Sequence, residues 1–188
     1  MRQTRRRALQ AILIGGIAIV VPGEQVFGES EAAEINRDAR AALERLYAED
    51  PGTAQLGKRA AGILVFPKIV KAGFIFGGQG GKGVLTINGQ PRRYYTIAAA
   101  SFGLQAGAQW FSYVLFFKDQ KALEYLDKSD GWAVGSDPNV VVVNKGAGVQ
   151  INTTTLAKEV VAVPFGQKGL MADLSLQGSK ITTYKPKS

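Results

Sequence analysis

The residues of this sequence that could perform acid–base chemistry are few. Three carboxylates, Glu124, Asp127 and Asp130, lie close together in the sequence. A pair of such groups can act as general acid and base in glycoside hydrolysis. The charged end of a helix in solvent explains the same residues more simply. Ser101 lies in the sequence AASFG, which imitates a nucleophile elbow without its first glycine.

Two residue types are missing from the chain, which contains no histidine and no cysteine. The first absence excludes a Ser-His-Asp site and any histidine-ligated metal. The second excludes disulfides, thiolate catalysis, zinc fingers and iron–sulfur clusters. Ser101 therefore has no imidazole base, and we expect a non-enzymatic protein without metal or cofactor. A hydrolase that uses the three carboxylates is the alternative.

Basic side chains offer a second kind of chemistry, the binding of phosphate. The candidates for lipid head-group binding are Lys68, Lys71, Lys82, Arg92, Arg93 and Lys168. A cation near an anionic membrane contributes about 1 kcal/mol to binding, so several together give weak, salt-sensitive attachment. Three of them, from Lys82 to Arg93, are expected on one hairpin, where their charges could converge. The alternative is scattered charge in solvent.

Residues 1–28 resemble an export signal. Arg5 and Arg6 precede a nearly uncharged stretch, residues 8–21, which is shorter than the roughly 20 residues that span a bilayer. The sequence TRRRALQ is similar to the twin-arginine motif. We therefore expect export by the twin-arginine route, cleavage after Gly28, and a periplasmic or secreted protein. An ordinary secretory signal is the alternative route. An uncleaved anchor is the third interpretation.

The charge balance changes when this segment is set aside. The whole chain has a formal net charge of +8, and residues 1–28 hold four arginines and one glutamate. Residues 29–188 therefore carry +5 and form a single domain by their length. This modest charge suits an anionic membrane surface, whereas nucleic-acid binding requires a concentrated basic stripe.

Helical periodicity appears at two places. Apolar residues recur every three or four positions over residues 29–50, which predicts an amphipathic helix that Pro51-Gly52 would stop. A second short helical stretch, residues 53–60, follows. Residues 119–126 predict a further short helix, with Asp119 as its N-cap.

From Gly62 onward the sequence changes to short apolar runs separated by Gly, Pro or Asn, which predicts strands. Asn88-Gly89 marks a chain reversal. Residues 110–117 and 140–143 are apolar on both alternating faces, so we expect both faces of these strands to be covered. The pattern predicts an α+β fold: an N-terminal helix packed on a curved, mostly antiparallel sheet or partial barrel, with one short helix inserted.

Residues 76–89 and 165–178 resemble each other. In each we expect a Gly-Gln hairpin turn, over residues 77–83 and 166–169, with some glycines at positive φ. If the two turns flank one head-group site, Lys82 and Lys168 lie on the same side of the sheet. The alternative is two similar hairpins without a shared function.

Four stretches carry a family resemblance. In chain order they read LVFPKIVKAGFIFGGQGGKGVL, YYTIAAASFGLQAGAQ, ALEYLDKSDGWAVG and FGQKGLMADLSLQGSKIT. Together they resemble the SYLF domain, a lipid-binding domain of exported bacterial proteins that is related to the eukaryotic Ysc84-type actin- and lipid-binding domain. The resemblance implies phospholipid binding and brings no catalytic residue with it. Actin is a ligand of some eukaryotic relatives, and we do not expect it for an exported protein.

The residues and the resemblance together predict a non-enzymatic phospholipid-binding or membrane-binding domain of the bacterial cell envelope. Its partner would be phospholipid or an anionic membrane surface, and not nucleic acid. A structural or protein-interaction module of the periplasm is the alternative.

Overall fold

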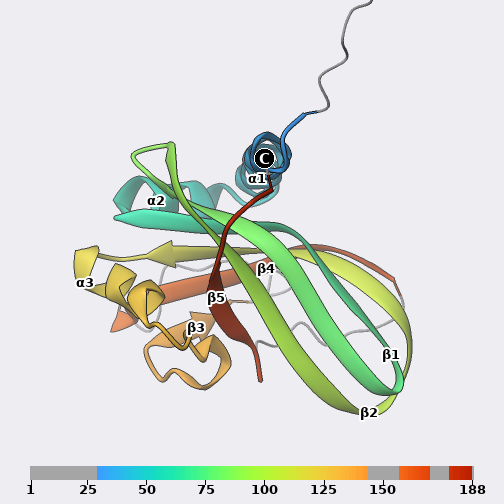
Figure 1. Cartoon of the computed structure of the whole chain (residues 1–188). Coiled ribbons are helices and arrows are strands. Elements are labelled where there is room, and N and C mark those ends of the chain that lie inside the picture. Colours follow the sequence, from blue (N-terminus) through green and yellow to red (C-terminus); the bar gives the residue numbers. More distant parts are fainter. Residues whose placement is uncertain (1–28, 144–156, 170–177, 188) are drawn as a thin grey trace, which may run out of the picture.

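A computed structural model of the chain describes residues 29–143, 157–169 and 178–187. The predicted export signal, including Arg5 and Arg6, lies outside the described residues. Within these ranges the fold is α+β, with helices against a curled sheet that forms a half-barrel (Figure 1). No helix in the described ranges is long and apolar enough to cross a membrane.

The two N-terminal helices are α1 (Glu31–Glu49) and α2 (Pro51–Arg59). Ser30 caps α1 as an acceptor for the Ala33 amide at 3.3 Å, which confirms the predicted helix start. The first helix ends before Pro51-Gly52, as predicted, and the expected second helix begins at Pro51 and not at residue 53. Asp50 ends α1 and its carboxylate accepts the Gly52 amide at 3.0 Å, so it also begins α2. Proline fits there because the first helical amide needs no partner.

One long hairpin dominates the sheet. Its strands are β1 (Gly62–Ile87) and β2 (Gln90–Phe117), joined at Asn88-Gly89. Both turn residues have positive φ, 52° and 74°, as a two-residue hairpin turn of this kind requires, which confirms the predicted reversal. The separate short strands expected within this region are instead continuous, since the glycines between them remain in register with the facing strand.

The hairpin is folded over on itself near its middle, where the register shifts between Phe74 and Phe76. The two halves of β1 then cross at Gly81 and Gly83. A Cβ atom on Gly81 would lie 2.6 Å from the Lys68 carbonyl oxygen, and one on Gly83 only 2.5 Å from that of Val65. The glycines therefore allow two backbones to touch.

This crossing corrects the turn predicted at residues 77–83. None of the glycines of that described stretch has positive φ, and each pairs across to β2 as a strand residue. In the second predicted turn, residues 166–169, Gly166 does have φ of 65°, yet it lies within β4. Both Gly-rich segments are strands.

The other strands extend the sheet beyond the free edge of β2. They are β4 (Val160–Gly169) and β5 (Lys180–Tyr184), both antiparallel to β2, and β3 (Val140–Val142), which pairs parallel with β4. The sheet is therefore mostly antiparallel, as predicted. The inserted helical turns follow β2 and are α3 (Gln120–Leu123), η1 (Glu124–Asp127) and η2 (Val134–Ser136). Asp119 caps α3 through the Ala122 amide at 2.9 Å, as predicted.

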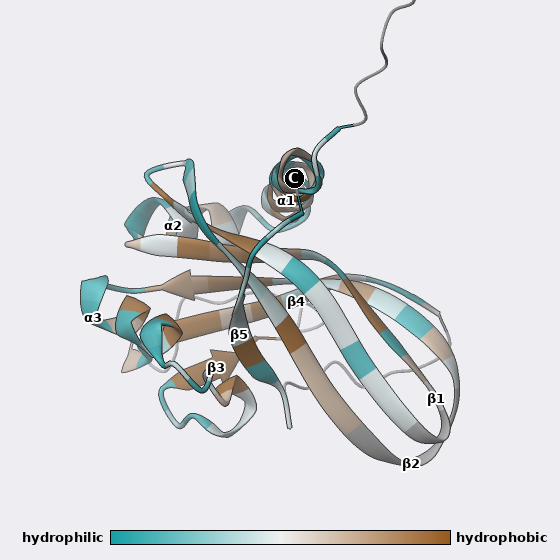
Figure 2. Cartoon of the chain, in the orientation of Figure 1, coloured by the Kyte–Doolittle hydropathy of each residue, from teal (hydrophilic) through white to brown (hydrophobic). Residues whose placement is uncertain are grey.

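Apolar side chains pack on both sides of the sheet, and Figure 2 shows that β3 and β4 consist largely of hydrophobic residues. On one side Leu46 of α1 packs with Val114 and Phe165. On the other, Tyr113 packs with Trp132. Residues 111–117 are consequently buried on both faces, as predicted. The same prediction is wrong at two places. Trp110 is exposed, and β3 lies at the edge of the sheet with Val142 36% exposed.

Candidate functional site

Three of the six predicted lipid-binding residues line cavities on the face of the sheet that α1 covers. Lys68 and Lys168 line one cavity of about 350 Å³, and Lys68 and Lys82 line a second of about 630 Å³. Asp38 of α1 and Pro67 also line both cavities. We therefore treat the two cavities as one groove, the α1 groove. Lys82 and Lys168 thus face the same side of the sheet, at different parts of this groove.

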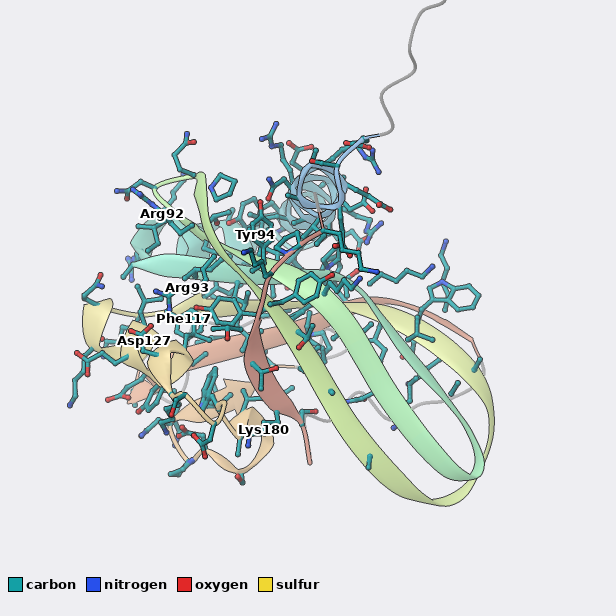
Figure 3. The ribbon with its side chains drawn as sticks, in the orientation of Figure 1. Arg92, Arg93, Tyr94, Phe117, Asp127 and Lys180 are labelled. Carbon is teal, nitrogen blue, oxygen red and sulfur yellow. The ribbon has the colours of Figure 1, made fainter. Side chains whose placement is uncertain are left out.

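The other three predicted residues lie elsewhere. Arg92 is exposed near the end of the hairpin, and Arg93 points toward Asp127 on the side of α3 (Figure 3). Lys82 pairs in register with Thr96, three residues from Arg93, so Lys82 and Arg93 point to opposite faces. The expected convergence of the hairpin charges is therefore absent. Lys71 is buried, with 4% of its surface exposed.

Lys82 is held in a cluster that ties the start of α1 to the C-terminal tail. Its ammonium group donates to the Glu31 carboxylate and lies 5.0 Å from the centre of the Tyr184 ring. The Tyr184 hydroxyl and the Lys187 amide also donate to Glu31, at 2.7 and 2.6 Å. These hydrogen bonds, that from Lys82 first, lower the pKa of Glu31 to about 2. In this arrangement the charge of Lys82 is already neutralised.

The three carboxylates considered for catalysis lie on the surface. Glu124, Asp127 and Asp130 are all exposed, and Asp127 forms an ion pair with Arg93. The Asp127 hydrogen bond is the first cause of a raised Arg93 pKa. The ion pair with Arg93 therefore already occupies the Asp127 carboxylate. Across the described ranges, no group of three or more His, Cys, Asp or Glu is placed to hold a metal ion.

An exposed apolar pair lies between the cations of the α1 groove. Val70 and Trp110 face each other in the β1–β2 register and are 42% and 44% exposed. Trp110 also pairs in register with Lys168 of β4, and Lys68 lies two residues before Val70. Lys68, Trp110 and Lys168 therefore lie on three neighbouring strands, with Trp110 on the middle one.

The groove has a further cation, Arg45 of α1. Its guanidinium donates to the Ser112 hydroxyl at 3.2 Å and lies 5.4 Å from the centre of the Phe165 ring. Ser112 in turn donates to the Pro67 carbonyl at 2.7 Å. These contacts fix the guanidinium beside Lys68 and Lys168, all of which line the same cavity.

The sequence did not reveal three of these groove residues. Trp110 begins a run that is apolar on both faces, and Val70 and Arg45 fit the strand and helix patterns. Trp110 is exposed and its neighbour Phe111 is buried, and only the strand register and the extent of α1 explain this difference. A tryptophan next to Gln109 at the start of an apolar run was the one available signal.

Comparison with known proteins gives two findings. Residues 98–187 match the sequence family described as "Ysc84: Las17-binding protein actin regulator". The chain is also 25% identical over 146 residues to beta cell expansion factor A of Aeromonas veronii. That match covers 78% of this chain and 54% of the relative, so the chain spans about half the length of the curated relative it matches. The family match includes Trp110 and Lys168, whereas α1 and Lys68 precede it.

Proposed function

The chain belongs to the Ysc84 family, also called SYLF, and from this premise we propose that it binds phospholipid at an anionic membrane surface as a non-enzymatic domain of the bacterial cell envelope. Binding of lipid or actin is the known role of this family, which supports a binding domain here. The proposed export by Arg5 and Arg6 favours lipid over actin, because the protein would then meet bacterial membranes.

The observation that carries the proposal is the Val70–Trp110 pair between Lys68 and Lys168. Tryptophan is favoured at the membrane–water interface because its ring is apolar and its N–H is polar. Lysines beside it would attract anionic head groups. The pair is already exposed, so contact with a membrane requires no opening of the core.

Five of the six predicted residues have different roles in this proposal, and the sixth, Lys71, is buried. Lys68 and Lys168 make the first contact, with Arg45 behind them in the same cavity. Arg92 adds long-range attraction from the end of the hairpin. Lys82 and Arg93 contribute only if a lipid phosphate displaces Glu31 or Asp127 from them.

Co-sedimentation with anionic and neutral vesicles tests the proposal. Lys68→Gln with Lys168→Gln removes two charges and should weaken binding to anionic vesicles by about 2 kcal/mol at low salt, roughly 30-fold. Binding to neutral vesicles should hardly change. The matched control is Lys58→Gln with Lys121→Gln, which removes two exposed charges outside the groove.

Two results would count against the groove. An equal loss in both double variants would mean that net charge alone drives binding. Full binding by the groove variant would mean that lipid binds elsewhere on the protein, and absence of vesicle binding by the unmodified protein would favour the protein-interaction module.

A further inference from the structure

A separate cavity lies at the end of β4 opposite the α1 groove. It has a volume of about 250 Å³ and opens between the end of α2, the end of β2 and the start of β4. Val161 lines this cavity and Lys168 lines the α1 groove. Seven residues of strand separate them, which is about 23 Å. The two sites are therefore distinct.

The inner wall of this cavity is apolar. Leu56 comes from α2, Phe116 from β2 and Val161 from β4, and all three belong to the buried cluster beneath the helices. Ala60 lies at the rim, where α2 ends. A volume of about 250 Å³ is near the lower limit of ligand pockets, about 300 Å³. It suits one short or medium alkyl chain and not the two chains of a phospholipid.

The rim of the cavity is cationic. Arg59, Lys118 and Lys158 line it, and none of its lining residues is acidic. The Lys158 ammonium donates to the Pro138 carbonyl at 2.7 Å, which positions it without neutralising its charge. Arg59 lies in the last turn of α2, where it also interacts favourably with the helix dipole.

An apolar wall with a cationic rim matches an amphiphile with one chain and one negative charge. We infer that this cavity binds a free fatty acid, with the alkyl chain between Leu56, Phe116 and Val161 and the carboxylate at Arg59 and Lys158. This site is independent of the phospholipid surface proposed above, because it shares no lining residue with the α1 groove.

Calorimetric titration with decanoate, below the concentration at which it forms micelles, tests the inference. The unmodified protein should bind decanoate with a stoichiometry near one, and decanol at least tenfold more weakly because it lacks the charge. Arg59→Gln with Lys158→Gln should weaken decanoate binding at least tenfold. Both side chains reach the surface, so this variant should remain folded, which a circular dichroism melt checks.

A second variant tests the apolar part of the cavity. Ala60→Phe places a ring at the rim and should abolish decanoate binding, while a circular dichroism melt reports whether the fold is kept. Lys58→Gln is the matched control for a lost charge on α2, and the groove variant Lys68→Gln with Lys168→Gln should bind decanoate normally.

Three outcomes would overturn the inference. These are decanol binding as tight as that of decanoate, normal decanoate binding by the two cavity variants, and loss of decanoate binding by the groove variant. A fourth outcome would identify a different ligand for the cavity. If Ala60→Phe weakens vesicle co-sedimentation as strongly as decanoate binding, the cavity takes an acyl chain of a membrane phospholipid and not a free fatty acid.

Discussion

Glu31 is the residue on which the attachment of α1 to the rest of the molecule depends most clearly. It accepts from Lys82, from the Tyr184 hydroxyl and from the Lys187 amide, so one carboxylate joins the first turn of α1 to β1 and to the tail after β5. Figure 1 shows the C-terminal tail running up to α1. The contact holds the acidic end of α1 over the groove.

Glu31 also predicts how stability changes in acid. The pKa of this carboxyl is lowered from 4.5 to about 2 in the folded protein. A carboxyl whose pKa is lowered by folding stabilises the folded state at any pH above its pKa in the unfolded chain. This stabilisation is lost as the pH falls from about 4.5 toward 2. Glu31→Gln should therefore lower the urea midpoint at pH 7 and flatten its change across this window.

The control for this measurement is Glu34→Gln. Glu34 lies on the same helix, is exposed, and also lines the groove. Its variant should keep the urea midpoint of the unmodified protein at pH 7. Identical pH profiles for Glu31→Gln and the unmodified protein would show that the cluster does not stabilise the fold.

At the scale of elements, the folded-over hairpin decides the shape of the groove. It brings Lys68, from the first half of β1, beside Gly81 in the second half. Lys82 and Lys68 therefore line the same cavity although they belong to one strand. The crossing requires two residues without side chains, and Gly81 and Gly83 supply them.

Gly83→Ala tests this crossing. The added Cβ would lie 2.5 Å from the Val65 carbonyl oxygen and 2.6 Å from an atom of the Phe66 ring, so the backbones must separate. Overpacking of this kind costs about 1–3 kcal/mol of unfolding free energy, measurable by urea denaturation. The matched control is Gly78→Ala, whose Cβ would make ordinary contact at 3.6 Å with the Ala99 carbonyl oxygen. Equal stabilities of the two variants would contradict the close crossing.

The elements also show which structural features a local sequence pattern can predict. The cap at Ser30, the helix pattern to Asp50 and the Asn88-Gly89 turn depend on neighbouring residues, and all were predicted correctly. A Gly-rich stretch is different, because glycine serves equally in a turn and where two backbones touch. Which one applies at Gly81 depends on Lys68 across the fold, and no local pattern contains that contact.

The same limit applies to the site. Lys68, Trp110 and Lys168 were each visible in the sequence, and the two lysines were named as candidates. Their proximity follows from the register of three strands, β1, β2 and β4. The bulges in that register, such as the shift between Trp110 and Ser112, decide which side chains share a face. Such irregularities have no reliable sequence signal here.

At the scale of the whole molecule, the proposed function requires the protein to leave the cytoplasm. Replacing the pair by Arg5→Lys and Arg6→Lys should trap a reporter fusion in the cytoplasm if the twin-arginine route exports the protein. Fractionation of cells that express the fusion measures this directly. Unchanged export would indicate the general secretory route, and a reporter retained in the cytoplasm even with the unmodified arginines would contradict the proposed location.

The tryptophans offer the most direct test of membrane contact. The chain has two of them. Trp132 is buried and donates to Asp137 at 2.9 Å, whereas Trp110 is exposed between Lys68 and Lys168. An emission change on addition of vesicles should therefore come from Trp110 alone.

The decisive measurement is the tryptophan emission of the protein titrated with anionic vesicles, compared with Trp110→Phe. We predict a shift to shorter wavelength and quenching by brominated lipid chains in the unmodified protein, because Trp110 enters the interface. Both effects should be absent in Trp110→Phe and weak with neutral vesicles. If vesicles bind the protein while Trp110 emission stays unchanged, the groove does not face the membrane and the proposed lipid surface is wrong.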